Sequence, residues 1–124
     1  MRGSMYDHIG IRVKDLDVAL RFYETALKPL GHVPGSRGDA YAGLGPKGSP
    51  AFWLHLAKKA QPAGCHVAFQ APDRAAVDRF HAAGLKAGGR DNGKPGVRKD
   101  YGENYYAAFL IDPDGNNVEA VCMV

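Results

Sequence analysis

The chain has 124 residues, of which 45% are hydrophobic and 23% charged, and a formal net charge of +3; these values are typical of one globular domain. No stretch approaches the roughly 18–20 apolar residues of a membrane-spanning helix. The basic residues are scattered rather than clustered as on a nucleic-acid-binding surface. Membranes and nucleic acid are therefore not expected partners. The N-terminus lacks a signal peptide, and two cysteines form no disulfide framework, so we expect a cytoplasmic location.

The sequence repeats itself once. Residues 1–4, before Met5, read as the leader of an expression vector, and the expected single domain spans 5–124. A shift of 58 positions gives seven identities in a window of 24, where chance gives about one or two. The identical pairs are His8/His66, Asp15/Asp73, Arg21-Phe22/Arg79-Phe80, Leu27-Lys28/Leu85-Lys86 and Gly31/Gly89. We expect module one at about 5–58 and module two at about 64–124.

The first copy begins with alternating residues that predict a strand over 8–13. A helix follows, with Asp15 or Asp17 as its N-cap. Its predicted apolar stripe is Leu16, Leu20, Tyr23 and Leu27. Pro29 and Gly31 end the helix. Two later strands are expected, a weak one near 39–44 and a clear one over 51–57.

The second copy has the same order. A strand starts at His66, and Asp73 caps a helix that buries Val77, Phe80 and Leu85 and ends at Gly88-Gly89. Later strands are expected near 97–99, over 105–111 and over 117–123, the last two joined by a turn at 112–115. The glycine-rich run 84–102 is predicted to be a long loop that forms a lid or rim. Each copy thus indicates a βαβββ module, and two tandem modules make an α+β fold.

Potential metal ligands recur in the two copies. His8 and His66 occupy the face of the first strand that points away from the helix, and His55 and Glu119 lie on the last strand of their copies. Two histidines and a carboxylate, with a third histidine available, suit a divalent metal with open coordination positions. A single histidine on a strand is more often structural. The recurrence of His8 and His66 favours a shared site that includes Glu119.

Three segments together resemble the vicinal oxygen chelate superfamily, which includes glyoxalase I, extradiol dioxygenases, and fosfomycin- and bleomycin-resistance proteins. They are Tyr6-Asp7-His8-Ile9-Gly10-Ile11-Arg12-Val13-Lys14-Asp15-Leu16, then Arg21-Phe22-Tyr23, and Ala108-Phe109-Leu110-Ile111-Asp112-Pro113-Asp114-Gly115-Asn116-Asn117-Val118-Glu119. The resemblance implies two modules that form a cup-shaped mixed sheet, and a homodimer. It also implies a divalent ion (Fe, Mn, Ni, Zn or Co) on His8, His66 and Glu119, with His55 as a further contributor. Glyoxalase I usually has Glu where this chain has His55, which argues against glyoxalase I proper.

The resemblance favours a metal-dependent glyoxalase- or dioxygenase-like enzyme, a lyase, an isomerase or a dioxygenase. Its metal would bind two neighbouring oxygens of a small substrate and act as a Lewis acid, with Glu119 or His55 as the base. Candidate substrate contacts are Arg12, Trp53, Gln70 and Tyr105, with Arg98 and Lys99 drawing an acidic substrate towards the mouth. The alternative is a metal-free protein that sequesters a small molecule, as bleomycin-resistance proteins do, and a third possibility is an interaction module.

Overall fold

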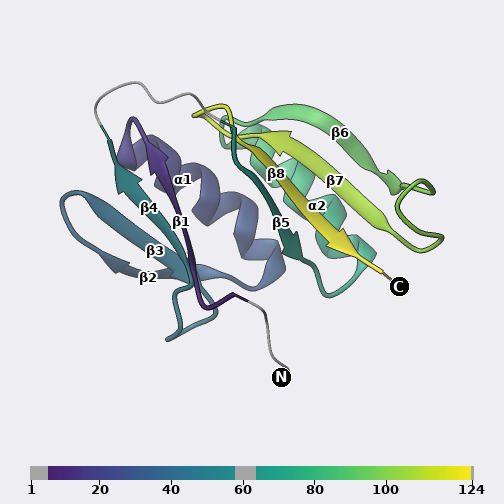
Figure 1. Ribbon diagram of the computed structural model, residues 1–124, viewed down its shortest axis with the longest axis horizontal. Coiled ribbons are helices and arrows are strands. Elements are labelled where there is room, and N and C mark those ends of the chain that lie inside the picture. The colour runs from purple at the N-terminus through teal and green to yellow at the C-terminus, as the bar shows by residue number, and fades with distance from the viewer. Residues whose placement is uncertain (1–5, 58–63, 124) are drawn as a thin grey trace.

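A computed structural model describes residues 6–57 and 64–123. Two helices, one short 3-10 helix and eight strands follow each other along the chain (Figure 1). In order these are β1 (Ile9–Val13), α1 (Leu16–Leu27), η1 (Lys28–Leu30), β2 (Val33–Arg37), β3 (Tyr41–Gly45), β4 (Phe52–Leu56), β5 (His66–Gln70), α2 (Arg74–Lys86), β6 (Arg90–Val97), β7 (Tyr106–Ile111) and β8 (Asn117–Cys122). The two βαβββ modules predicted from the repeat are confirmed.

Equivalent N-caps fix the two helices in the same place. The Asp15 carboxylate accepts a hydrogen bond from the Val18 backbone N at 3.1 Å, and the Asp73 carboxylate accepts one from the Ala76 N at 2.8 Å. Each bond satisfies one of the free N–H groups of a first helical turn. Both pairs are related by the same shift of 58 residues, so the repeat extends from the sequence into the hydrogen bonding.

Each module forms its own four-stranded mixed sheet. The strand orders are β1-β4-β3-β2 and β5-β8-β7-β6. The first and last strands of each module pair in parallel, and the other neighbours pair antiparallel. Strands β1 and β5 are the inner strands of the two sheets and face the centre of the molecule (Figure 1), and the described residues include no hydrogen-bonded pairing between the sheets.

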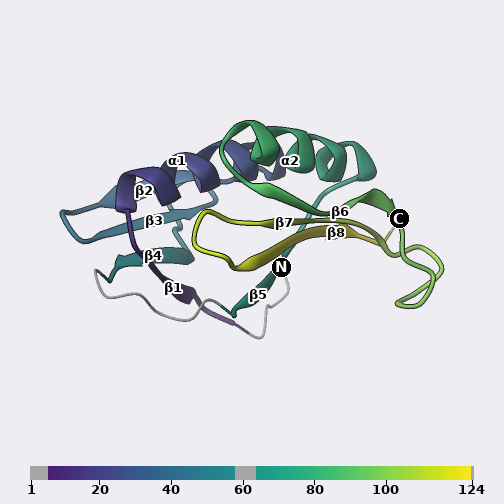
Figure 2. The same ribbon diagram turned by 90° about the horizontal axis from the view of Figure 1, so that it is seen from above.

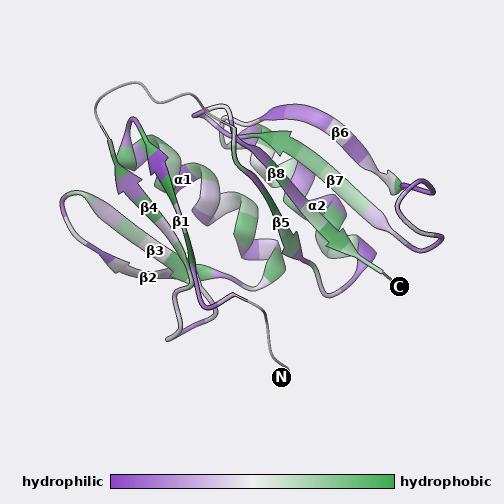
Figure 3. Cartoon of the chain, viewed as in Figure 1, coloured by the Kyte–Doolittle hydropathy of each residue, from purple (hydrophilic) through white to green (hydrophobic). Residues whose placement is uncertain are grey.

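Both helices cover the same side of the two sheets (Figure 2). The hydrophobic residues that face the helices, coloured green along the strands in Figure 3, form one continuous core across both modules. Its largest fully buried side chains include Tyr23, Phe22 and Phe80. None of the helices in the described part of the chain is long and apolar enough to span a membrane. The opposite, helix-free side of both sheets is here called the open face.

Two edge strands differ from the prediction. Strand β2 was not predicted, and β6 lies inside the glycine-rich run 84–102, which is therefore not a long loop. Strand β2 is exposed along its whole length, and β6 is interrupted by register shifts at Asp91/Gly93 and Gly93/Gly96. Edge strands tolerate proline, glycine and polar residues because one side of their backbone forms no ladder, so they lack the alternation on which the prediction depended.

The core face of α2 also differs from the prediction in one position. Leu85 is 41% exposed, whereas the preceding Gly84 is buried. A side chain at Gly84 would overlap Leu110 of β7. The helix therefore approaches the sheet closely at a glycine, and Leu85 turns to solvent.

A buried polar link joins the modules. The Tyr23 hydroxyl of α1 donates to the Asp112 carboxylate in the β7–β8 turn, and the Lys14 backbone N donates to Asp114 at 2.8 Å. Asp112 is 2% exposed and also accepts from the backbone N of Asp114 and from the backbone N and Nδ2 of Asn116. A buried carboxylate is stable only when its oxygens are hydrogen-bonded in this way.

The link predicts a loss of stability at alkaline pH. Burial, and next the Asp112 charge, raise the pKa of Tyr23 well above its usual value. The stabilisation is therefore complete below the unfolded-state pKa of about 10 and is lost as the pH rises above it, by about 1.4 kcal/mol per pH unit. Urea unfolding at a series of pH values should show this decline. The decline in the free energy of unfolding should be smaller in Tyr23→Phe, by about 1.4 kcal/mol per pH unit. An equal decline in the wild-type protein and in Tyr23→Phe would show that Tyr23 is not its cause.

Candidate functional site

A histidine and a glutamate meet on the open face of the second sheet. His66 begins β5, and Glu119 lies in the middle of β8 beside Ala68 and Phe109 of the neighbouring strands. The His66 Nε2 atom is 3.0 Å from Glu119 Oε1. The His66 side chain is half-exposed, whereas Glu119 is 2% exposed. The pair therefore combines a buried carboxylate with an accessible imidazole.

Two hydrogen bonds hold this pair in place. The Tyr105 hydroxyl donates to Glu119 Oε2, so the two carboxylate oxygens have different partners. The His66 Nδ1 atom is 3.2 Å from the Asn117 carbonyl oxygen. Burial, and next the bond to Glu119, raise the pKa of Tyr105 to about 12, so the phenol stays protonated and remains a donor at neutral pH. Tyr105, predicted as a substrate contact, therefore orients Glu119.

The first sheet presents the other predicted residues. The His8 side chain is 62% exposed and its Nδ1 lies 2.8 Å from the Asp7 carboxylate. On β4, His55 is paired with Arg12 of β1, and its ring lies against Gly10, where a Cβ would be 3.1 Å from His55 Nε2. Gly10 therefore leaves the space that the imidazole occupies, two residues along the strand from His8.

The strand register separates His55 from the position that corresponds to Glu119. In the second sheet Glu119 pairs with Ala68, whose repeat equivalent is Gly10. Gly10 pairs with Trp53. Trp53 is thus the equivalent of Glu119, and His55 lies two residues further along β4. Sequence spacing alone did not reveal this offset.

Trp53 forms an aromatic surface at that position. Its ring lies across Gly43 of β3, where a Cβ would be 2.6 Å from the ring, and it is 6.2 Å from the ring of Tyr41. The side chain is half-buried. The first sheet thus offers an apolar wall where the second sheet offers a carboxylate.

A single chain does not assemble the whole predicted ligand set. His66 and Glu119 are together, but the described residues contain no group of three histidine, cysteine, aspartate or glutamate side chains placed to hold a metal. His8 and His55 lie with the first sheet. Of the predicted substrate contacts, Arg12 and Trp53 also belong to the first sheet, and Gln70 is exposed at the far end of β5.

A cavity of about 350 Å³ opens beside the His66–Glu119 pair. It is lined by Asn92, Gly93, Arg98, Asp100, Tyr101, Phe109 and Asn117. The Phe109 ring is stacked on the His66 ring with 6.3 Å between centroids, which joins the cavity to the pair. Most of these residues come from the run predicted to be a loop. The sequence signals for a binding site there were the charges at 98–99 and the prediction that this run forms a lid or rim.

Two βαβββ modules, with a His–Glu pair and a cavity on the second of them, define a two-module α+β protein. The sequence pattern of the Glyoxalase/Bleomycin resistance protein/Dioxygenase superfamily matches residues 6–120, and the chain belongs to this family.

Solved structures agree with this assignment. A glyoxalase/bleomycin resistance protein from Albidiferax ferrireducens is 32% identical with a TM-score of 0.81, over 95% of this chain and 98% of that chain. A glyoxalase/bleomycin resistance protein/dioxygenase family enzyme from Burkholderia phytofirmans is 17% identical with a TM-score of 0.74, over 95% and 98% of the two chains. A hypothetical protein from S. aureus is 21% identical with a TM-score of 0.70, over 98% and 94%. The last two show the fold alone. No curated protein gives a significant match.

Proposed function

We propose that the protein is a metal-dependent enzyme that acts on a small substrate chelated through two neighbouring oxygens. The observation that carries this proposal is the His66–Glu119 pair, with Nε2 and Oε1 3.0 Å apart and the carboxylate held from behind by Tyr105. An imidazole nitrogen and a carboxylate oxygen this close together are suitable donors for one divalent metal.

His8 of a second copy would complete the ligand set. Metal sites with open positions need about three protein ligands, and one chain brings two together. Because the two modules are related by the repeat, the first sheet of one copy has the shape to face the second sheet of another. A twofold homodimer would then form two identical sites, each with His8 from one copy and His66 and Glu119 from the other.

Each residue of the site would have a separate role in the reaction. The bound metal would supply Lewis-acid polarisation of the substrate oxygens. Glu119 is held at both oxygens and is suited to be a ligand, which leaves His55 as the base, accepting a proton at an imidazole nitrogen. Trp53 would form an apolar wall. Arg12 and Gln70, exposed on the open face, would contact the ends of the substrate.

Metal analysis tests the proposal. The protein would be stripped with a chelator and reloaded separately with Fe, Mn, Ni, Zn and Co. We expect about one ion per chain in the wild-type protein and in His55→Ala, and none in His8→Ala or His66→Ala. No ion in the folded wild-type protein would refute the proposal. Loss of the ion in His55→Ala as well would make His55 a fourth ligand instead of the base.

A second candidate is a metal-free protein that sequesters a small molecule. It is favoured by the aromatic surface of Trp53 over Gly43 beside Tyr41, because planar apolar side chains are typical walls of such sites. This candidate predicts that the folded protein takes up no metal and that a small aromatic ligand quenches Trp53 fluorescence, with the quenching unchanged by chelator.

Replacement of Tyr105 by phenylalanine should weaken metal binding by about 10- to 100-fold, since partners that orient a ligand have effects of this size. The hydroxyl that fixes Glu119 Oε2 would be lost while the ring is kept. The control is Tyr101→Phe, because Tyr101 packs edge-on against Tyr105 with centroids 5.2 Å apart but is 66% exposed. Competition with a metal-sensitive dye measures both affinities. Equal affinities for the two variants would show that Tyr105 does not support the metal ligand.

A further inference from the structure

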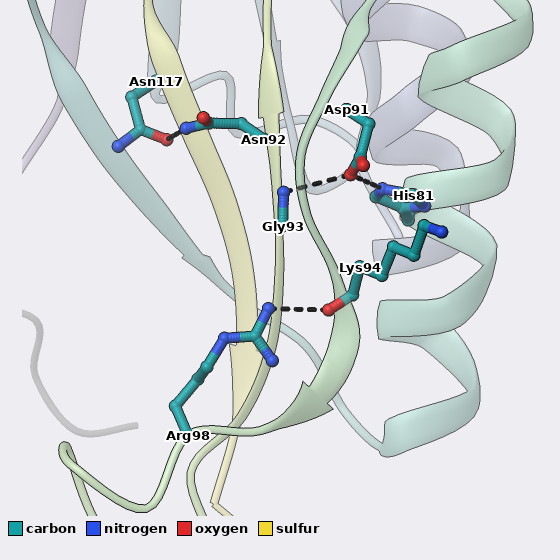
Figure 4. Close-up of polar contacts among 7 residues, drawn as sticks. All are labelled: His81, Asp91, Asn92, Gly93, Lys94, Arg98 and Asn117. Atoms are coloured by element: carbon teal, nitrogen blue, oxygen red, sulfur yellow. Dashed lines mark hydrogen bonds and ion pairs between the residues drawn. The ribbon is translucent and has the colours of Figure 1, made fainter.

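The guanidinium of Arg98 is fixed against the second sheet at the cavity. Its Nη1 donates to the Gly96 carbonyl at 3.0 Å and its Nη2 to the Lys94 carbonyl at 2.6 Å. The charge also lies over the Phe109 ring, 5.4 Å from the centroid. Figure 4 shows the side chain of Arg98 reaching back along β6 to the Lys94 carbonyl. An arginine held by two carbonyls and a ring has little freedom left to lose when it binds a ligand.

Two glycines make room for this guanidinium. A Cβ at Gly93 would lie 3.1 Å from Nη2, and a Cβ at Gly96 would lie 3.1 Å from Nη1. Gly93 also has a φ of +151° and lies close to Phe109. Both positions coincide with the register shifts of β6. The irregular part of the edge strand therefore forms a seat for Arg98.

The seat is tied to the helix behind the sheet. The Asp91 carboxylate accepts from the Gly93 backbone N at 3.0 Å and lies 2.8 Å from Nε2 of His81, a buried residue of α2 (Figure 4). These contacts hold the bulge in one conformation. The position of Arg98 is thus set by the fold and not by a flexible loop.

Donors remain available in the cavity. A guanidinium has five N–H groups, and the two carbonyls accept from two of them. Nearby, the Asn92 Nδ2 donates to the Asn117 Oδ1 at 3.3 Å (Figure 4), which turns the Asn117 Nδ2 into a further possible donor. Asp100 is the acidic residue of the lining. One fixed positive charge with amide donors and one opposing carboxylate suits a monoanion better than a more highly charged group.

We propose that this cavity binds the carboxylate of a small monoanionic substrate, with Arg98 as the residue that selects for it. The forked N–H groups of arginine match the two oxygens of a carboxylate. Phe109 contacts both Arg98 and His66, so it lies between the anion subsite and the His66–Glu119 pair. This inference rests on the proposed function for the other end of the substrate, the two neighbouring oxygens.

Benzoate and benzamide test the anion subsite, because they have the same shape and differ in charge. Each would be titrated into ¹⁵N-labelled protein in the presence of a chelator, following the side-chain amides of Asn92 and Asn117. We expect benzoate to bind at least about 10-fold more tightly than benzamide, and Arg98→Gln to lose about 10-fold or more of that affinity. Lys99→Gln removes the same charge from the next residue. Lys99 is not among the described residues that line the cavity, which departs from its expected role of drawing in the substrate, so this variant should bind benzoate as the wild type does.

A second variant keeps the charge and removes the seat. Gly96→Ala places a methyl group against Nη1, so we expect benzoate affinity to fall while the net charge is unchanged. The Gly96→Ala variant also tests the anion subsite if Arg98→Gln does not fold. Equal binding of benzoate and benzamide, or equal losses in Arg98→Gln and Lys99→Gln, would overturn the proposal. Because the chelator removes any metal, failure of the metal site leaves this result unaffected, and the reverse also holds.

Discussion

Replacement of Asp112 by alanine will lower the free energy of unfolding by about 3–5 kcal/mol, a loss typical of a broken buried charge network. The carboxylate accepts from four donors, and two of them come from side chains, Tyr23 and Asn116. Alanine would leave the buried Tyr23 hydroxyl without this partner and release the β7–β8 turn. The module interface would then lose its polar link as well as its turn.

Urea unfolding followed by circular dichroism measures this change. Tyr23→Phe removes one of the four bonds and should cost about 1–3 kcal/mol. Asp39→Ala, at an exposed carboxylate, should change stability by less than about 0.5 kcal/mol. If Asp112→Ala is no less stable than Asp39→Ala, the turn does not hold the modules together.

Substitution of Glu119 by glutamine will reduce divalent-metal affinity by about 100-fold or more, because the neutral amide lacks the negative charge with which the carboxylate binds the ion. The amide has the same size and can still accept from Tyr105. The metal-free protein should be as stable as the wild type or more so, since a neutral group is easier to bury than a carboxylate. Metal affinity and stability should therefore change independently.

Isothermal titration with the preferred ion and thermal unfolding in chelator measure the two effects. Glu103→Gln is a matched control, because it makes the same change at an exposed position. Unchanged metal affinity in Glu119→Gln would remove Glu119 from the ligand set. A large loss of stability in chelator would instead make Glu119 a structural residue.

The fold was predictable because its strongest signals are local and occur twice. The caps Asp15 and Asp73 and the alternating strands β1 and β5 repeat at one spacing, so each supports the other. Edge strands β2 and β6 carry no such pattern, since one side of their backbone is free and their glycines serve bulges. Sequence periodicity therefore identifies the centre of each sheet better than its edge.

The site was predictable only where strand neighbours lie close in register. His66 and Glu119 were predicted and meet across β5 and β8. The relation between Glu119 and Trp53 depends on which residues of β1 and β4 pair, and spacing does not determine this pairing. The seat of Arg98 depends on two bulges in β6 and on Phe109 from another strand, and neither was visible in the sequence.

One measurement tests the central claim, that the metal site combines residues of two copies. His8→Ala and Glu119→Ala would be purified, stripped of metal, mixed in equal amounts, allowed to exchange subunits and reloaded. Each mixed dimer would hold one intact site, from His8 of one copy with His66 and Glu119 of the other. We predict almost no metal in either variant alone and about a quarter of the wild-type content in the mixture. A mixture with no more metal than its separate components would contradict the account.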